Sequence, residues 1–203
     1  MTDDAHTIVD IIRHGEPVGG KKYRGQQDDP LSEKGWTQMR ESIGEHKPWD
    51  IIISSPLVRC AAFAEELSQR HQISVEIEER VKEIGWGDWE GKTPAELNAQ
   101  DPLAVARATS DPLNHRPSNA ESVHDFHRRI ADAWQHITER HREKHILVVA
   151  HAGVIRAILT NVLNTPAENM FRIHVPNASI TRIHVEHHEG NPFPKLIFHD
   201  GRL

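Results

Sequence analysis

Two histidines stand where strands are predicted to end. Arg13-His14-Gly15-Glu16 follows an apolar, β-rich run at residues 7–12, and His151-Ala152-Gly153 follows a second run at residues 146–150. Imidazole can act as a nucleophile or exchange a proton near neutral pH, and a guanidinium binds anionic oxygens through parallel N–H groups. Ligands of open α/β sheets bind at the carboxyl ends of the strands, so we expect both histidines in one crevice.

Several common catalytic and nucleotide-binding patterns are absent from the sequence. It contains no GxxxxGK[ST] phosphate loop, no GxGxxG dinucleotide turn, no GxSxG nucleophile turn and no HExxH zinc motif. Metal storage or sensing by the 16 histidines is an alternative, since His141 and His145 have the i,i+4 spacing of two ligands on a helix. No recognisable third ligand accompanies this pair, so we predict no metal site.

The elements that must position these residues alternate along the chain. Short apolar runs predict strands buried on both faces at residues 7–12, 51–54, 75–77 and 146–150. Helical patterns cover residues 31–46, 57–71, 122–142 and 153–163, and closing strands are predicted at residues 180–185 and 195–199. The predicted N-caps are Ser32, Ser55 and Ser122. This alternation predicts an α/β fold with a mainly parallel sheet and helices on both faces.

Residues 85–117 interrupt the alternation. Glycines and prolines break this stretch into short pieces, which predicts a covering insertion of short helices and loops. Its composition is not that of a linker, and the sequence has no internal repeat. We therefore predict one domain over residues 1–203.

Composition excludes several classes of protein. The chain has 203 residues, and 24 basic against 30 acidic side chains give a net charge of −6, which argues against nucleic-acid binding. No apolar run approaches the roughly 18 residues that span a bilayer, and the first residues lack the pattern of a signal peptide. The single Cys60 cannot form an intrachain disulfide. These features predict a cytoplasmic protein that binds neither nucleic acid nor membrane.

Five motifs occur in the order found in one known family. They are Arg13–Glu16 (RHGE), residues 25–35 (GQQDDPLSEKG), residues 54–59 (SSPLVR), Glu83 with residues 87–91 (GDWEG), and residues 151–153 (HAG). With these motifs the chain resembles the histidine phosphatase superfamily, also called phosphoglycerate-mutase-like, over nearly its whole length. The resemblance implies a three-layer α/β/α sandwich.

The resemblance also implies a role for each motif residue. His14 would be the nucleophile that forms a phosphohistidine, and Arg13 and Arg59 would clamp the phosphoryl oxygens. His151 would donate to the transferring phosphoryl group, and Glu83 would act as general acid and then as base. The nearby alternatives for this acid are Glu16, Asp88 and Glu90.

The loop after the RHGE motif departs from the family pattern. Many members have Thr and Asn where this chain has Pro17 and Gly20, and relatives often have Gln, Ser or Thr where Arg24 precedes Gly25. Arg24 is either an additional cation for the substrate or a solvated side chain. The predicted substrate-binding residues are Arg13, Arg59, His151, Arg24 and Gly25.

The function implied by the resemblance is a phosphatase for a small phosphorylated metabolite, with no metal and no cofactor. The length and the first motifs look most like the α-ribazole phosphatase branch, and general phosphatases of sugar phosphates or nucleotides are equally close. A mutase with the same phosphohistidine and a non-catalytic module that binds a phosphorylated ligand are the alternatives. A homodimer is left open.

Overall fold

The computed structural model describes residues 6–46, 48–189, 191–201 and 203, and these contain a six-stranded sheet. Its strands are β1 (Thr7–Arg13), β2 (Ile51–Ser54), β3 (Val75–Ile77), β4 (His145–Ala150), β5 (Ile180–His188) and β6 (Asn191–Gly201). They lie in the order β3-β2-β4-β1-β5-β6. Strands β3, β2, β4 and β1 run parallel, and β5 and β6 join the sheet antiparallel. The prediction of an α/β fold with a mainly parallel sheet is confirmed.

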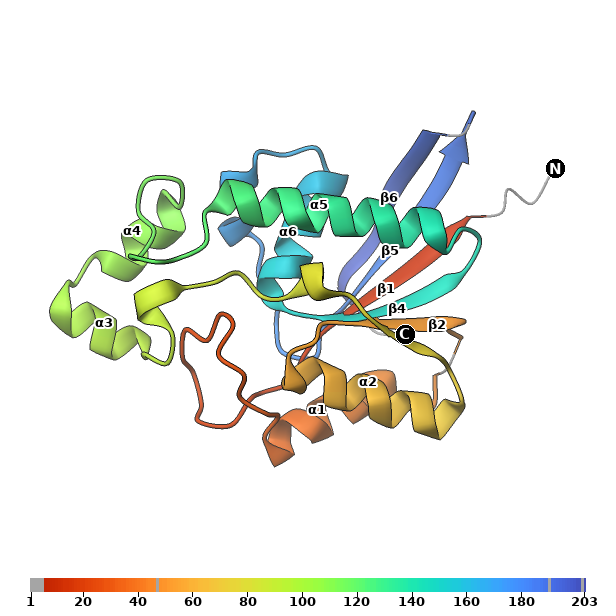
Figure 1. The fold of residues 1–203 in the computed structure, drawn as a ribbon, viewed down its shortest axis with the longest axis horizontal. Helices are drawn as coiled ribbons and strands as arrows, with labels where there is room; N and C mark the ends of the chain where they lie inside the picture. The colour runs from red at the N-terminus through yellow and green to blue at the C-terminus, as the bar shows by residue number, and fades with distance from the viewer. Residues whose placement is uncertain (1–5, 47, 190, 202) are drawn as a thin grey trace.

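Helices cover both faces of this sheet. The longer ones are α1 (Glu33–Ile43), α2 (Val58–His71), α5 (Val123–Arg140) and α6 (Ala152–Val162), and η3 (Ala167–Arg172) is a 3₁₀ helix after α6. Figure 1 shows α1 and α2 on one side of the strands and α5 and α6 on the other. The three-layer α/β/α arrangement follows from this placement.

The alternating direction of side chains along each strand divides the core into two halves. Ile52, Leu147 and Val149 pack with residues of α1 and α2, whereas Ile53 and Val148 pack with residues of α5 and α6. All five side chains are buried. These central strands are therefore buried on both faces, as the continuous apolar runs predict.

Strand β3 is an exception to that prediction. It lies at the edge of the sheet, where only β2 pairs with it. Ile77 is 51 % exposed, and Val75 and Glu76 are only partly buried. The prediction of burial on both faces is wrong here because an apolar run does not reveal whether a strand will be central or at an edge.

Two further local predictions need correction. Strands β5 and β6 extend past the predicted runs, because backbone pairing continues to the opposed residues His188 and Asn191. Helix α2 has Leu57 as its N-cap instead of Ser55. The Val58 N–H in its first turn donates to the Asp28 carboxylate at 2.7 Å, and Asp28 is 30 positions away. A cap supplied from a distant loop is invisible to local sequence patterns.

The predicted insertion at residues 85–117 forms short helices. They are η2 (Gly87–Trp89), α3 (Pro94–Gln100) and α4 (Ala104–Ser110), preceded by η1 (Glu79–Val81). Thr93 and Glu96 form a reciprocal capping box that starts α3. Figure 1 shows α3 and α4 beyond the end of the sheet toward which β1 and β4 run. None of the helices in the described residues has the length and apolarity needed to cross a membrane.

Asp10 is fully buried in the middle of β1 and accepts hydrogen bonds from three side chains. The Arg182 guanidinium donates to both carboxylate oxygens at 2.7 and 2.9 Å. Trp49 Nε1 and His145 Nε2 donate to Oδ2 at 2.9 and 2.8 Å. Burial alone would raise the pKa of Asp10, but these hydrogen bonds outweigh burial and hold its pKa at about 2.

Replacing Asp10 with asparagine is expected to lower the free energy of unfolding by about 2–4 kcal/mol at neutral pH, because the partly buried Arg182 loses its counter-charge and the hydrogen bonds to a buried carboxylate are lost. The folded pKa of Asp10 lies below the unfolded value of 3.8, so this stabilisation is present above the unfolded pKa and is lost as the pH falls toward 2. Urea unfolding of both proteins at about pH 7, 5 and 3 measures it. The difference between them should shrink at the lowest pH, and a constant difference would contradict the prediction.

Candidate active site

The carboxyl ends of β1 and β4 bring the two predicted histidines together. These strands pair in parallel with Arg13 opposite Ala150, and the His14 N–H donates to the Ala150 carbonyl at 2.9 Å. His151 follows Ala150 directly, and the two imidazole rings meet edge to face with centroids 5.2 Å apart. The register of two neighbouring strands thus makes the histidines neighbours.

The His14 ring is held in one tautomer. Its Nδ1 lies 2.7 Å from the Gly15 carbonyl oxygen. A carbonyl only accepts, so Nδ1 carries the proton and the lone pair is on Nε2. Burial, reinforced by the charges of Arg13 and Arg59, lowers the pKa of His14 well below its ordinary value. The ring is therefore neutral at neutral pH, with Nε2 able to attack an electrophile.

His151 is fully buried beside His14. Its Nε2 lies 2.7 Å from the Ser55 hydroxyl oxygen and 3.6 Å from the Cys60 sulfur. Burial, together with the charge of Arg59, lowers the pKa of His151 well below its ordinary value.

Arg13 and Arg59 are oriented by backbone carbonyls. Arg13 Nη1 donates to the Val175 oxygen at 2.6 Å, and the two terminal nitrogens of Arg59 donate to the Gln27 and Gly25 oxygens at 2.8 Å. The Nε atoms of both arginines are buried and have no acceptor among the described residues. Burial lowers the pKa of Arg13 to about 10, so its guanidinium remains charged at neutral pH. Buried cationic donors without an acceptor fit an anionic ligand.

Glu83 is bound to the start of α6. Its Oε2 accepts from the Gly153 N–H at 3.2 Å, and its Oε1 accepts from the Ile84 N–H at 3.0 Å. A Cβ atom on Gly153 would lie only 2.2 Å from Oε1, so any other residue there would displace the carboxyl group. The glycine of the HAG motif therefore permits the close approach of Glu83 to this helix.

Arg129 on α5 positions the segment that carries Glu83. Its guanidinium donates to the carbonyl oxygens of Arg80, Lys82 and Glu83 at 2.6, 2.9 and 3.1 Å. The Glu121 carboxylate holds the same guanidinium from the other side at 2.7 and 2.8 Å. One arginine thus replaces the hydrogen bonds that regular secondary structure would supply to these carbonyls.

The alternative carboxyl groups have other surroundings. Glu16 lines the same cavity as Glu83, but its carboxylate is paired with Lys34 at 2.9 Å. Asp88 is exposed, and Glu90 accepts hydrogen bonds from two backbone N–H groups. Neither Asp88 nor Glu90 lines the cavity. Of the four candidates, only Glu83 faces the cavity without a paired cation among the described residues.

Arg24 stabilises the loop that follows the RHGE motif. Its guanidinium is paired with Asp29 at 3.0 Å and donates to the Val18 and Gly20 carbonyls, both at 2.6 Å. The Arg24 side chain is 9 % exposed, so the solvated alternative is wrong. Gly25 follows in a left-handed conformation with φ of 53°, which favours glycine. Both residues line the cavity, with most of Arg24's donors used by the loop.

An open cavity of about 410 Å³ lies at this edge of the sheet. Six of the predicted site residues line it: Arg13, His14, Arg24, Gly25, Arg59 and Glu83. The seventh, His151, does not line the cavity. From the insertion, only Trp86 contributes to the lining. The cavity is also lined by Tyr23, Arg156 and Asn177, which were not among the predicted residues. Only Arg156 had a signal in the sequence, as a charge within an apolar stretch.

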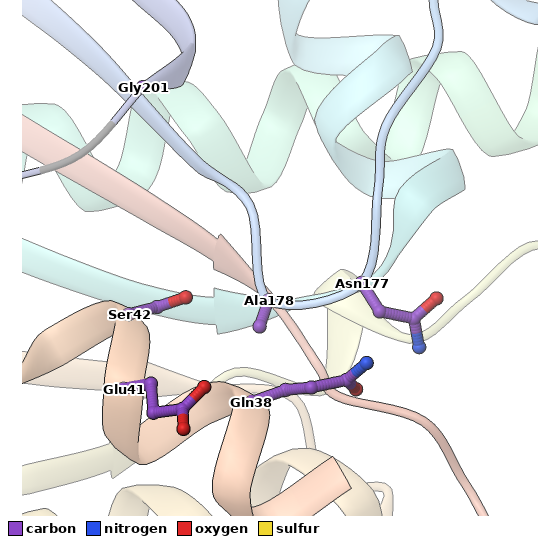
Figure 2. A pocket seen from close by; sticks show the side chains of 6 residues that line it. All are labelled: Gln38, Glu41, Ser42, Asn177, Ala178 and Gly201. Carbon is purple, nitrogen blue, oxygen red and sulfur yellow. The ribbon is translucent and has the colours of Figure 1, made fainter. Parts of the chain in front are cut away.

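A second cavity of about 430 Å³ adjoins the first, because Asn177 lines both. Figure 2 shows Gln38, Glu41 and Ser42 of α1 on one side of it and Asn177 and Ala178 on the other. Among the described residues, its lining includes the Glu41 carboxylate and no basic side chain. The described residues thus offer a phosphoryl group cationic donors in the first cavity, where Arg13 and Arg59 line the wall, and none in the second.

The metal-binding alternative receives no support from the described residues. No group of three or more His, Cys, Asp or Glu side chains there could hold a metal ion. The interpretation of His141 and His145 as ligands on one helix is wrong, because α5 ends at Arg140 and His145 begins β4. His141 instead lies near Glu76, and His145 binds Asp10.

Comparison with known proteins identifies the family. The model of the histidine phosphatase superfamily (branch 1) matches residues 9–192. The chain belongs to this superfamily. Phosphoserine phosphatase 1 of Hydrogenobacter thermophilus is 30 % identical to this histidine phosphatase over 184 residues, covering 87 % of this chain and 85 % of the relative. The adenosylcobalamin/α-ribazole phosphatase of Salmonella typhimurium is 28 % identical over 170 residues, covering 81 % and 84 %.

A solved structure shares the fold. A mycobacterial glucosyl-3-phosphoglycerate phosphatase is 27 % identical and superposes with a TM-score of 0.83, covering 95 % of this chain and 97 % of that chain. The chain is an enzyme of the histidine phosphatase type that acts on phosphorylated small molecules.

Proposed function

We propose that this histidine phosphatase hydrolyses small phosphomonoesters through a covalent phosphohistidine at His14, without a metal ion. The observation that carries the proposal is the pairing of a neutral His14, whose lone pair is on Nε2, with two buried guanidinium groups that have unused Nε donors. The cations of Arg13 and Arg59 supply the charge that a metal ion would otherwise provide to the phosphoryl oxygens.

In the first step, His14 Nε2 attacks phosphorus and the bond between phosphorus and the ester oxygen breaks. Glu83 gives its proton to the departing oxygen, so the alcohol leaves neutral and Glu83 becomes a carboxylate. The Gly15 carbonyl keeps the proton on Nδ1 and stabilises the cationic phosphoimidazole. Arg13 and Arg59 hold the phosphoryl oxygens throughout this transfer.

In the second step, the Glu83 carboxylate removes a proton from a water molecule that attacks the phosphohistidine. The bond between phosphorus and Nε2 breaks, the electron pair returns to His14, and inorganic phosphate leaves with the oxygen of water. Both the nucleophile and the acid are then restored. The Gly153 N–H at the start of α6 stabilises the negative charge that Glu83 carries between the two steps.

Several phosphorylated small molecules are candidate substrates. The named relatives act, by their names, on phosphoserine, α-ribazole phosphate and glucosyl-3-phosphoglycerate. α-Ribazole 5′-phosphate is the substrate suggested by the early motifs of the sequence. A mutase would use the same first step but return the phosphoryl group to the substrate instead of to water.

Phosphate release from a panel of phosphomonoesters, measured with EDTA present, tests this proposal. The panel contains α-ribazole 5′-phosphate, phosphoserine, 3-phosphoglycerate, sugar phosphates and nucleotides. We expect rapid release that EDTA does not diminish. Release that stops with EDTA and returns with a divalent cation would overturn the metal-independent mechanism, and phosphoryl exchange without free phosphate would favour the mutase.

A further inference from the structure

Arg156 is a charged residue in an otherwise buried helix. From Ala152 to Thr160, every residue of α6 except Arg156 is buried. Placing a guanidinium in such an apolar surrounding is unfavourable unless its donors are used. Arg156 instead lines the catalytic cavity together with Arg13 and Glu83. Neither the nucleophilic step nor the hydrolytic step proposed above uses it.

The Arg156 side chain is held in one orientation by the segment after α6. Its Nε donates to the Ile173 carbonyl at 2.9 Å, and its guanidinium carbon lies 5.8 Å from the centre of the Phe171 ring. The two terminal nitrogens have no acceptor among the described residues. One edge of the guanidinium is thus fixed to the protein, and the edge with both terminal nitrogens is free for a ligand.

Two other charged side chains of the cavity already have ion-pair partners. Arg24 is paired with Asp29, and Glu16 is paired with Lys34. A phosphoryl group bound by the two arginines of the RHGE and SSPLVR motifs leaves Arg156 as a partly buried cation whose terminal nitrogens have no acceptor among the described residues. Burial lowers the pKa of Arg156, and the nearby Glu83 charge opposes that effect. A second anion in the cavity would stabilise the charged form of this guanidinium.

We propose that Arg156 binds a carboxylate of the substrate, on the same molecule as the phosphoryl group held by Arg13 and Arg59. This inference rests on the proposed function and names the substrate class as phosphorylated carboxylic acids. A free edge with two parallel donors matches the two oxygens of a carboxylate. Lys21 and Lys22, which line the same cavity, add attraction for a ligand that carries both charges.

Two pairs of substrates test this inference. 3-Phosphoglycerate carries a carboxylate that glycerol 3-phosphate lacks. In the same way, phosphoserine carries a carboxylate that phosphoethanolamine lacks. We expect the wild type to prefer the acid in at least one pair. Arg156→Gln should lower kcat/KM for that acid by about tenfold or more, mainly through KM, and leave the partner compound nearly unchanged. Arg156→Lys should restore part of the loss.

The control is Arg128→Gln, which removes an exposed arginine of α5 outside the cavity and should leave both pairs unchanged. Equal losses on the acid and its partner would overturn the inference, because a merely structural role of Arg156 would affect both. Calorimetry of 3-phosphoglycerate binding to His14→Ala, with and without Arg156→Gln, gives a readout that does not need turnover. If the two proteins bind 3-phosphoglycerate with equal affinity, the inference is overturned, whether or not the proposed function is correct.

Discussion

Replacing His14 with alanine is expected to lower kcat/KM for every phosphomonoester by about 10⁴-fold or more. Alanine removes the only side chain in the proposed mechanism that forms a bond to phosphorus, while Arg13 and Arg59 can still bind the phosphoryl group. Phosphate release and rapid quenching with a substrate labelled in the phosphoryl group measure the effect. The wild type should retain label as an acid-labile phosphoramidate, and the variant should retain none.

The matched control for this loss is His127→Ala. His127 is a partly buried histidine of α5 whose Nε2 contacts the Thr160 hydroxyl at 3.1 Å, outside the cavity. It should keep near wild-type activity. Burial and the nearby guanidinium charges hold the pKa of His14 well below its ordinary value, so wild-type labelling should persist at about pH 6. Label that remains in His14→Ala would assign the nucleophile to another residue.

Replacing Glu83 with glutamine is expected to lower kcat for alkyl phosphates by about 10²–10⁴-fold, because the alcohol must then leave as an alkoxide. Glutamine can keep the hydrogen bond from Gly153 but has no proton to transfer to the leaving oxygen. p-Nitrophenyl phosphate has a good leaving group and should still phosphorylate His14 rapidly. Stopped-flow measurement should show a burst of nitrophenolate close to one equivalent, followed by slow hydrolysis.

The comparison between leaving groups separates this role from a structural one. Glu16→Gln changes a second carboxyl group of the same cavity and should show no such dependence on the leaving group. If Glu83→Gln loses the same activity on alkyl and nitrophenyl esters, with no burst, then Glu83 is not the acid of the first step. A dependence that appears in Glu16→Gln instead would assign the acid to Glu16.

Pre-organisation of these groups comes mainly from the backbone. Carbonyl oxygens of Val175, Gln27 and Gly25 orient the arginines of the clamp, and the Gly15 carbonyl sets the tautomer of His14. Because these acceptors belong to the loops between strands and helices, the side chains of Arg13, Arg59 and His14 are oriented before a ligand binds. The proposed active site is thus built by loop geometry at one edge of the sheet.

Much of the fold could be predicted from local patterns. The apolar runs correctly located the central strands, because a strand covered on both faces must be apolar along its length. Helical periodicity located α5, and Ser122 does cap it by accepting from the Asp125 N–H. The patterns were insufficient for the edge strand β3 and for the cap of α2, since neighbours in space decide both features.

By itself, the sequence determined which residue types stand at the strand ends. Because parallel strands end at the same edge, this was enough to predict that His14 and His151 are neighbours. Only the tertiary structure decided the direction of each side chain: His151 binds Ser55 instead of lining the cavity, and Arg156 faces the cavity from a buried helix. Such directions depend on packing and on hydrogen-bond partners distant in the sequence, which no local pattern encodes.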